Sequence, residues 1–158
     1  MITTSVVQWA EKASDWFDQY HQVPEAQRDW ETWQAPYRQG VIAGVDLLRG
    51  TSVFEVGCGA GPNLRFLQHH RPQLRLGGSE PATHPRLWAS EHCGIQIQPG
   101  ILPADLPGPE WDIMLSCYVL AYLNKADVQR VLGGCLTRGL ILMEPEAGAF
   151  GLWLAGVL

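Results

Sequence analysis

The sequence lacks the cysteine pattern of a metal site or of a disulfide framework. Its four cysteines include no Cys-x-x-Cys pair and have no regular spacing, whereas zinc sites and small disulfide-bonded domains need closely paired or regularly spaced cysteines. The histidines also show no spacing that is typical of metal ligands. We therefore expect reduced, mostly buried thiols and no metal site.

Long apolar runs and an excess of positive charge are also absent. No stretch approaches the ~20 apolar residues that span a bilayer, and the N-terminus lacks the features of a secretory signal. The 11 basic and 16 acidic side chains give a formal charge of -5 without long runs of one sign, which disfavours a nucleic-acid partner. These absences predict a cytoplasmic protein that binds neither a membrane nor a nucleic acid.

What the chain does contain is enough apolar sequence for one domain. Its length of 158 residues, of which 46% are hydrophobic, is too short for two ordinary domains. We expect an N-terminal helical cap at residues 1–50, a ligand-binding core at 51–145 and an apolar tail at 146–158. Apolar side chains that recur at intervals of three and four predict a helix at residues 5–20, and a short helix that ends at Gly50 completes the cap.

Beyond Thr51, strand-like and helix-like segments alternate. Strands are expected at residues 52–56, 73–80, 94–98, 110–120 and 138–145, and helices at 61–70, 83–92 and 125–136. Alternation of this kind is typical of right-handed βαβ units and a parallel sheet. The sequence therefore predicts an α/β fold with a mainly parallel sheet.

A glycine-rich loop joins the first of these strands to the first helix of the core. Gly57, Gly59 and Gly61 alternate with other residues directly after the strand, where a tight turn needs positive φ and a ligand on the main chain needs neighbours without side chains. Such a loop lies where open α/β sheets bind ligands. The dinucleotide pattern GxGxxG fails, because Pro62 stands in place of its third glycine. The carboxylate of Glu55 would repel a pyrophosphate and attract a cationic ligand.

Four motifs in order give the chain a family resemblance. They are Glu-x-Gly-x-Gly-x-Gly at 55–61, an acidic Glu80 at the end of the second strand, "DIMLSCYVLAYL" at 112–123 and "LILMEP" at 140–145. In this series the chain resembles the class I S-adenosylmethionine-dependent methyltransferases. The resemblance implies a Rossmann-like three-layer sandwich with strand order 3-2-1-4-5, with S-adenosylmethionine as cofactor and S-adenosylhomocysteine as product.

The resemblance also implies a set of cofactor-binding residues. Glu55 would receive the methionine ammonium, or alternatively would only orient the loop backbone, and Glu80 would receive the ribose hydroxyls. The full implied set is Glu55, Gly57, Cys58, Gly59, Gly61, Glu80, Pro81, Ile101, Leu102, Ser116 and Cys117.

Two departures from the family pattern affect what can be carried over. Ile101 stands where many relatives have an aspartate that recognises adenine, so adenine recognition would rest on main chain and packing or on Asp105. The tail after the fifth strand is too short for the two further strands of the family. It leaves the fifth strand as an edge, or it pairs with that strand or with another subunit. We expect a homodimer through the fifth strand and the tail, because the apolar tail would otherwise be exposed.

The catalytic residue is not identified by the sequence. Tyr118, Tyr122 and His84 are candidates, with the core and the surface as their simpler interpretations. Cys58 is more typical of a small buried filler than of a nucleophile.

The cap contains one charged candidate and a group of aromatic residues. Arg38 would pair with the methionine carboxylate, or it is simply solvated. Trp30, Trp33 and Tyr37 would form a lid over a substrate, or they pack within the cap.

The acceptor is expected to be a small molecule. The acidic balance and the absence of "NPPY" or "DPPY" after the fourth strand disfavour methylation of nucleic acid or protein. The predicted function is methyl transfer to an oxygen, nitrogen or carbon of a small metabolite. The alternative is a catalytically inactive cofactor-binding protein that acts as a regulatory or scaffold partner, and an NAD-dependent oxidoreductase is disfavoured by Pro62.

Overall fold

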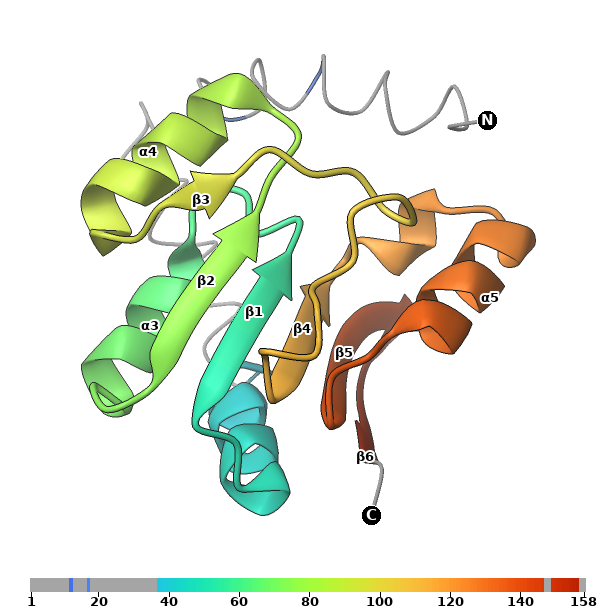
Figure 1. Ribbon diagram of the computed structural model, residues 1–158, viewed down its shortest axis with the longest axis horizontal. Coiled ribbons are helices and arrows are strands. Elements are labelled where there is room, and N and C mark those ends of the chain that lie inside the picture. Colours follow the sequence, from blue (N-terminus) through green and yellow to red (C-terminus); the bar gives the residue numbers. More distant parts are fainter. Residues whose placement is uncertain (1–11, 13–16, 18–36, 147–148, 157–158) are drawn as a thin grey trace.

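A six-stranded sheet forms the centre of the molecule. The computed structural model describes residues 12, 17, 37–146 and 149–156. The strands follow the order β3-β2-β1-β4-β5-β6, and the first five are parallel while β6 is antiparallel (Figure 1). The predicted order 3-2-1-4-5 and the Rossmann-like three-layer sandwich are confirmed. Most of the predicted cap at residues 1–50 lies outside the described residues.

The helices and strands of the core lie where the sequence predicts them. The strands are β1 (Ser52–Val56), β2 (Arg75–Ser79), β3 (Ile97–Gln98), β4 (Ile113–Cys117), β5 (Gly139–Glu146) and β6 (Ala149–Gly156). The helices are α3 (Pro62–His70), α4 (Thr83–Cys93), the 3-10 helix η1 (Leu120–Tyr122) and α5 (Lys125–Gly134). A further helix covers residues 37–48. Arg49, whose φ of 52° is left-handed, terminates it one residue before the predicted Gly50. None of the described helices is long and apolar enough to cross a membrane.

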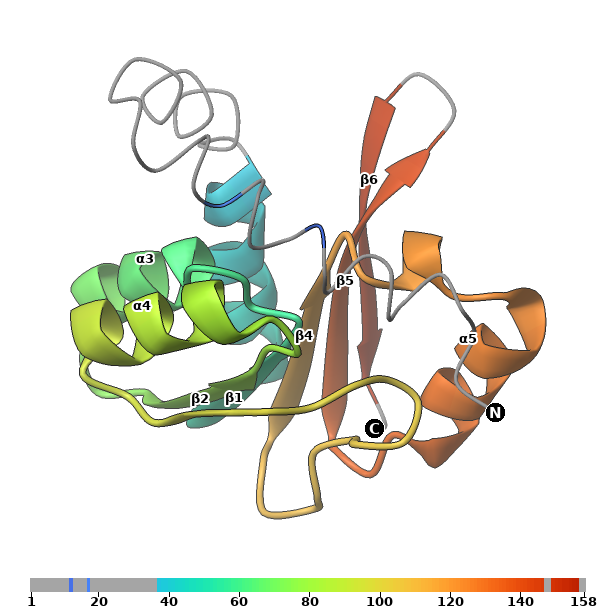
Figure 2. The ribbon, with the colours of Figure 1, turned by 90° about the horizontal axis from the view of Figure 1, so that it is seen from above.

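Helices cover both faces of the sheet. The helix at 37–48, α3 and α4 lie on one side, and α5 lies on the other (Figure 2). Because side chains alternate along a strand, neighbouring residues of β1 enter different cores. Val53 packs with the helix at 37–48 through Val41, Ile42 and Val45, whereas Phe54 packs with Val131 of α5. Every residue of β1 is buried, as expected for a central parallel strand.

The C-terminal tail forms β6 and pairs with β5. The pairing runs from Gly139 opposite Gly156 to Glu146 opposite Ala149. A free strand edge attracts another strand, and β6 occupies that edge of β5. Of the sequence alternatives, the tail therefore pairs with its own fifth strand, and a dimer through β5 itself would have to displace β6. A homodimer through the outer edge of β6 stays a prediction, which light scattering tests.

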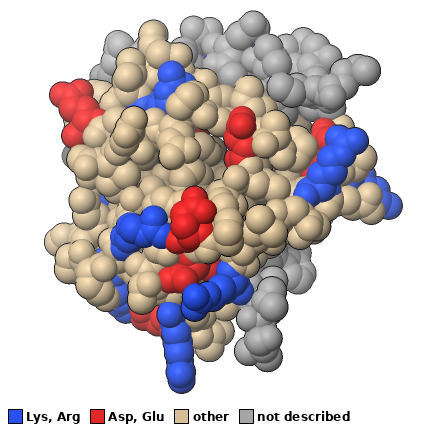
Figure 3. All heavy atoms as spheres, in the orientation of Figure 1, with Lys and Arg blue, Asp and Glu red and all other residues tan. Residues whose placement is uncertain are grey.

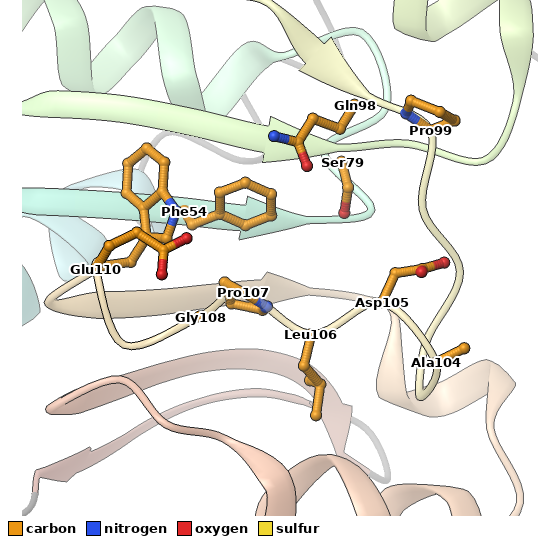
Figure 4. A pocket seen from close by; sticks show the side chains of 11 residues that line it. Phe54, Ser79, Gln98, Pro99, Ala104, Asp105, Leu106, Pro107, Gly108 and Glu110 are labelled. Carbon is orange, nitrogen blue, oxygen red and sulfur yellow. The ribbon is translucent and has the colours of Figure 1, made fainter.

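The connection from β3 to β4 crosses the α5 face of the sheet without a helix. We call residues 99–111 the strap; it contains no helical residue. Its last residue, Trp111, lies against Gly77 of β2, where a Cβ would come within 2.5 Å of the ring. Trp111 also meets Phe54 edge-on, with ring centroids 5.1 Å apart. Beside these rings, a hollow of about 280 Å³ opens between the strap and the ends of β1, β2 and β3 (Figure 4).

Candidate functional site

The glycine loop after β1 uses its three glycines for different purposes. All three have positive φ, at 64° for Gly57, 54° for Gly59 and 73° for Gly61. A Cβ on Gly57 would lie 2.5 Å from Val119, and one on Gly61 would lie 2.7 Å from the Cys93 sulfur. A Cβ on Gly59 would meet no atom of the described residues within 4 Å. Two glycines therefore allow close packing, and Gly59 alone borders open space.

Glu80 ties this loop to the end of β2. Its side chain is fully buried, and its two carboxylate oxygens accept backbone hydrogen bonds of 2.9 Å, one from the N–H of Gly59 and one from that of Ala82. Burial raises the pKa of Glu80, while these two bonds and the charge of Arg86 lower it. The next residue, Pro81, is half-buried beside it. The carboxylate therefore lies directly beside the open space at Gly59.

Glu55 is a second buried carboxyl, near the end of β1 just before the loop. Only 1% of the residue is exposed, and Asn63 of α3 donates a hydrogen bond of 2.7 Å from Nδ2 to its Oε1. Burial raises the pKa of Glu55 to about 7, against the lowering effects of Asn63, the Arg38 charge and the Cys117 thiol and with a further rise from Glu80. Glu55 thus changes its charge near neutral pH.

This raised pKa predicts how the stability of the unliganded protein depends on pH. Between pH 4.5 and about 7 the native state holds a proton on Glu55 that the unfolded state has lost, so stability falls as the pH rises through this window. The full loss corresponds to about 3 kcal/mol. Glu55→Gln is expected to recover it at pH 8 and to change little at pH 4.5. Urea unfolding at both pH values measures this, and an equal effect at both would contradict it.

The chain turns sharply at the end of β4. Ser116 is fully buried and Cys117 is half-buried. Tyr118 then takes a left-handed conformation with φ of 62°, while its N–H donates a hydrogen bond of 2.9 Å to the carbonyl of Met143. This turn brings Val119 against Gly57. A left-handed aromatic residue is uncommon, and strain of this kind concentrates at functional sites.

The strain at Tyr118 can be measured with a matched pair of variants. Tyr118→Gly and Tyr118→Ala both remove the ring, but only glycine adopts positive φ without steric cost. The glycine variant is expected to be more stable than the alanine variant by about 1 kcal/mol, although alanine is normally the more stabilising residue. Urea unfolding measures the difference, and a more stable alanine variant would show that the backbone is not strained.

The loop after β3 lies beside the end of β2. Ile101 is half-buried, and Leu102 is buried in the core of the α5 face. The carboxylate of Asp105 accepts a hydrogen bond of 2.9 Å from the N–H of Ile101, so it binds the backbone of its own loop. Gly100 packs this loop tightly against Ser79, since a Cβ there would lie 2.9 Å from the Ser79 Cβ. Ile101 and Leu102 are thereby held near the carboxyl end of β2.

The remaining candidates divide by exposure. Tyr122 and His84 are exposed. Cys58 is buried in the core between α3 and α4, where burial raises its pKa well above the usual value, so the filler interpretation fits it. Arg38 is also buried, with 7% exposed, and the solvated interpretation of this residue is wrong. Tyr37 is half-buried, and Trp30 and Trp33 lie outside the described residues.

Asn63 is the residue of this site that sequence reasoning missed. It follows Pro62 at the start of α3 and is 96% buried, with 4% exposed. Among the described residues, no hydrogen-bond donor reaches its Oδ1 or the Oε2 of Glu55. The available signal was an amide in the first turn of a helix that directly follows a glycine loop. Its pairing with Glu55 is visible only in three dimensions.

Comparison with known proteins relates this geometry to a fold. No protein-family model and no curated protein matches the sequence, but solved structures match the fold of this chain. The methyltransferase domain of bacterial CtHen1 matches with a TM-score of 0.58 and 16% identity, over 70% of this chain and 65% of its own. The StiE O-MT structure matches with a TM-score of 0.63 and 21% identity, over 81% of this chain and 50% of the StiE chain.

A third match is the plantazolicin methyltransferase BpumL in complex with a triazolic analog and SAH. It gives a TM-score of 0.53 and 12% identity over 87% of this chain and 60% of its own. This chain therefore spans only 50 to 65% of the length of the three structures. With the sheet order and the glycine loop already described, the matches show that this chain has the class I methyltransferase fold.

Proposed function

We propose that the protein transfers a methyl group from S-adenosylmethionine to a small-molecule acceptor. The observation that carries this proposal is the open space that the described residues leave at Gly59, whose N–H donates to the Glu80 carboxylate. The buried Glu55 lies close enough to Glu80 for their charges to interact. Main chain without a side chain suits close approach of a ligand, and two carboxylates suit an ammonium and a pair of hydroxyls. No arrangement of this kind is needed for packing, since Gly57 and Gly61 already provide the close contacts.

The residues present fit the cofactor that this fold class uses. Glu80 would hold the ribose hydroxyls, and Glu55 would hold the methionine ammonium. Arg38, a buried cation whose charge lowers the pKa of Glu55, would hold the methionine carboxylate. The remaining proposed contacts are Gly57, Cys58, Gly59, Gly61, Pro81, Ile101, Leu102, Ser116 and Cys117.

In this proposal the protein aligns the acceptor with the methyl group and excludes water from the site. The bound cofactor would supply an already activated methyl group on a sulfonium. The left-handed turn at Tyr118 brings Val119 against Gly57, two residues before Gly59 in the same loop. We propose that Tyr118 helps to align the acceptor there, whereas Tyr122 and His84 are exposed at η1 and at the start of α4 and are weaker catalytic candidates.

The charge distribution supports a small acceptor. On the face in Figure 3, basic side chains lie beside acidic ones and form no continuous basic patch, and the whole chain has a formal charge of -5. Nucleic-acid binding relies on an accumulation of Lys and Arg. The plantazolicin methyltransferase BpumL, which shares this fold, was crystallised with a small-molecule analog and SAH.

Calorimetry tests the cofactor part of the proposal. Titration with S-adenosylmethionine and with S-adenosylhomocysteine is expected to give saturable binding of one ligand per chain, and NAD is expected to give none. The affinity is also expected to rise from pH 6 to pH 8, because the ionised Glu55 binds the ammonium and its pKa is about 7. Failure to bind either adenosyl compound at high protein concentration would defeat the proposal.

A second candidate is a catalytically inactive protein that binds the cofactor and acts as a regulatory or scaffold partner. The observation in its favour is that two of the three catalytic candidates, Tyr122 and His84, are exposed. Methyl transfer in a screen of small metabolites, followed as formation of S-adenosylhomocysteine, would favour the enzyme. Tight cofactor binding without turnover, with recovery in a stable complex with another chain, would favour the partner.

A further inference from the structure

Two buried acceptor oxygens lie within one hydrogen-bonded unit beside the glycine loop. They are Oε2 of Glu55 and Oδ1 of Asn63, and no hydrogen-bond donor among the described residues reaches either. Both residues are more than nine-tenths buried, and the bond from Asn63 Nδ2 to Glu55 Oε1 joins them. The Cys117 thiol lowers the pKa of Glu55 through a side-chain hydrogen bond, but a thiol is a weak donor, and Oε2 is still left without a partner among the described residues. The two acceptors therefore call for a donor that the described part of the chain does not supply.

The free-energy cost of leaving these two acceptors unpaired indicates that they bind a ligand. A buried acceptor without a donor costs about 1 to 3 kcal/mol. A leucine at position 63 would avoid this cost for the amide oxygen, and α3 already has Leu64 and Leu67 in the core. The asparagine instead fixes one oxygen of Glu55 and leaves the other available. Asn63 thus sets which carboxylate oxygen can meet a ligand.

The chemistry of the two oxygens defines the group that they would bind. A carboxylate oxygen and an amide oxygen both accept, so the group must donate at least two hydrogen bonds, and the carboxylate favours a positive charge. Glu55 and Glu80 supply negative charge here, against Arg38 as the cation that lowers the pKa of Glu55. A primary ammonium meets both conditions with three N–H donors, whereas a water has two donors and no charge.

We propose that Asn63 is a binding and positioning residue for a primary ammonium, which it holds through Oδ1 together with Oε2 of Glu55. The inference rests on the proposed function, in which that ammonium belongs to the amino-acid half of the adenosyl ligand. It assigns to Asn63 the discrimination between adenosyl thioethers that carry an amino acid and those that do not.

A pair of ligands isolates this contribution. S-adenosylhomocysteine carries the amino acid, and 5′-methylthioadenosine has the same nucleoside and thioether without it. Calorimetry on Asn63→Leu is expected to show about 10- to 100-fold weaker binding of S-adenosylhomocysteine, as for the loss of a charged hydrogen bond. Binding of methylthioadenosine is expected to stay unchanged. Gln68→Leu, a matched amide on α3 that donates to the Cys93 carbonyl, is expected to change neither affinity.

Each outcome decides between the inference and the proposed function. If Asn63→Leu weakens both ligands equally, or neither, Asn63 has a merely structural role and the inference falls while the proposed function stands. If the unmodified protein binds neither ligand, the proposed function falls and takes the inference with it. Asn63→Ser, which keeps a polar side chain too short to reach, repeats the comparison if the leucine variant does not fold. A shift in the ratio of the two affinities in either variant supports the inference.

Discussion

Replacing Gly59 by leucine is expected to abolish the binding of S-adenosylmethionine and S-adenosylhomocysteine and to leave the protein folded. Within the described part of the chain, a Cβ at this position meets no atom within 4 Å, so the new side chain is expected to enter the open space and not the core. The left-handed backbone, with φ of 54°, adds a cost of about 1 to 2 kcal/mol to the folded state. The affinity for S-adenosylhomocysteine is expected to fall more than about 100-fold by calorimetry, because the leucine would occupy the place of the ligand.

Two other glycines of the chain provide controls for Gly59. Gly94 has nearly the same conformation, with φ of 62° and open space around its Cβ, but it lies at the end of α4. Gly94→Leu is expected to lose similar stability and to bind S-adenosylhomocysteine normally. Gly61→Leu is expected to unfold the loop, since its Cβ would lie 2.7 Å from the Cys93 sulfur. Normal binding by Gly59→Leu, or lost binding by Gly94→Leu, would contradict the proposed position of the ligand.

The part of the site that sequence alone predicted follows from the geometry of parallel sheets. Glu55 and Glu80 stand at the ends of two predicted strands, and the carboxyl ends of parallel strands share one edge of the sheet. The structure places both carboxylates beside the glycine loop, as expected. The spacing of the glycines also predicted the turn itself. Gly57, Gly59 and Gly61 all have the positive φ values that a tight turn after a strand requires.

The part that sequence did not predict depends on contacts between distant segments. The burial of Arg38, the bond from Asn63 to Glu55 and that from the Ile101 N–H to Asp105 have no periodic signal. The left-handed turn at Tyr118 also contradicts local propensity, which favours glycine or asparagine at positive φ. Departures of this kind are expected where local preference gives way to function.

The sequence also did not predict the arrangement of two whole segments, the tail and the strap. The apolar tail left its pairing open, and only the register of β6 on β5 decides it. The strap has four prolines, at positions 99, 103, 107 and 109, so it lacks the helix that usually covers this face of an α/β sheet. The sheet face over β1 and β2 then depends on few side chains. Among those described here, Trp111 makes the most specific contacts with Gly77 and Phe54.

Trp111→Ala is therefore expected to destabilise the protein by about 2 to 3 kcal/mol, less than for a fully buried aromatic side chain, because Trp111 is half-buried. The ring fills the space over Gly77 and meets Phe54 edge-on, and the strap has no helix to replace it. Arg75→Gln is the matched control, because it removes the guanidinium 3.9 Å from the ring centroid and leaves the ring. It is expected to cost about 0.5 to 1 kcal/mol. Urea unfolding measures both, and a smaller loss for Trp111→Ala than for Arg75→Gln would show that the strap does not depend on the indole ring.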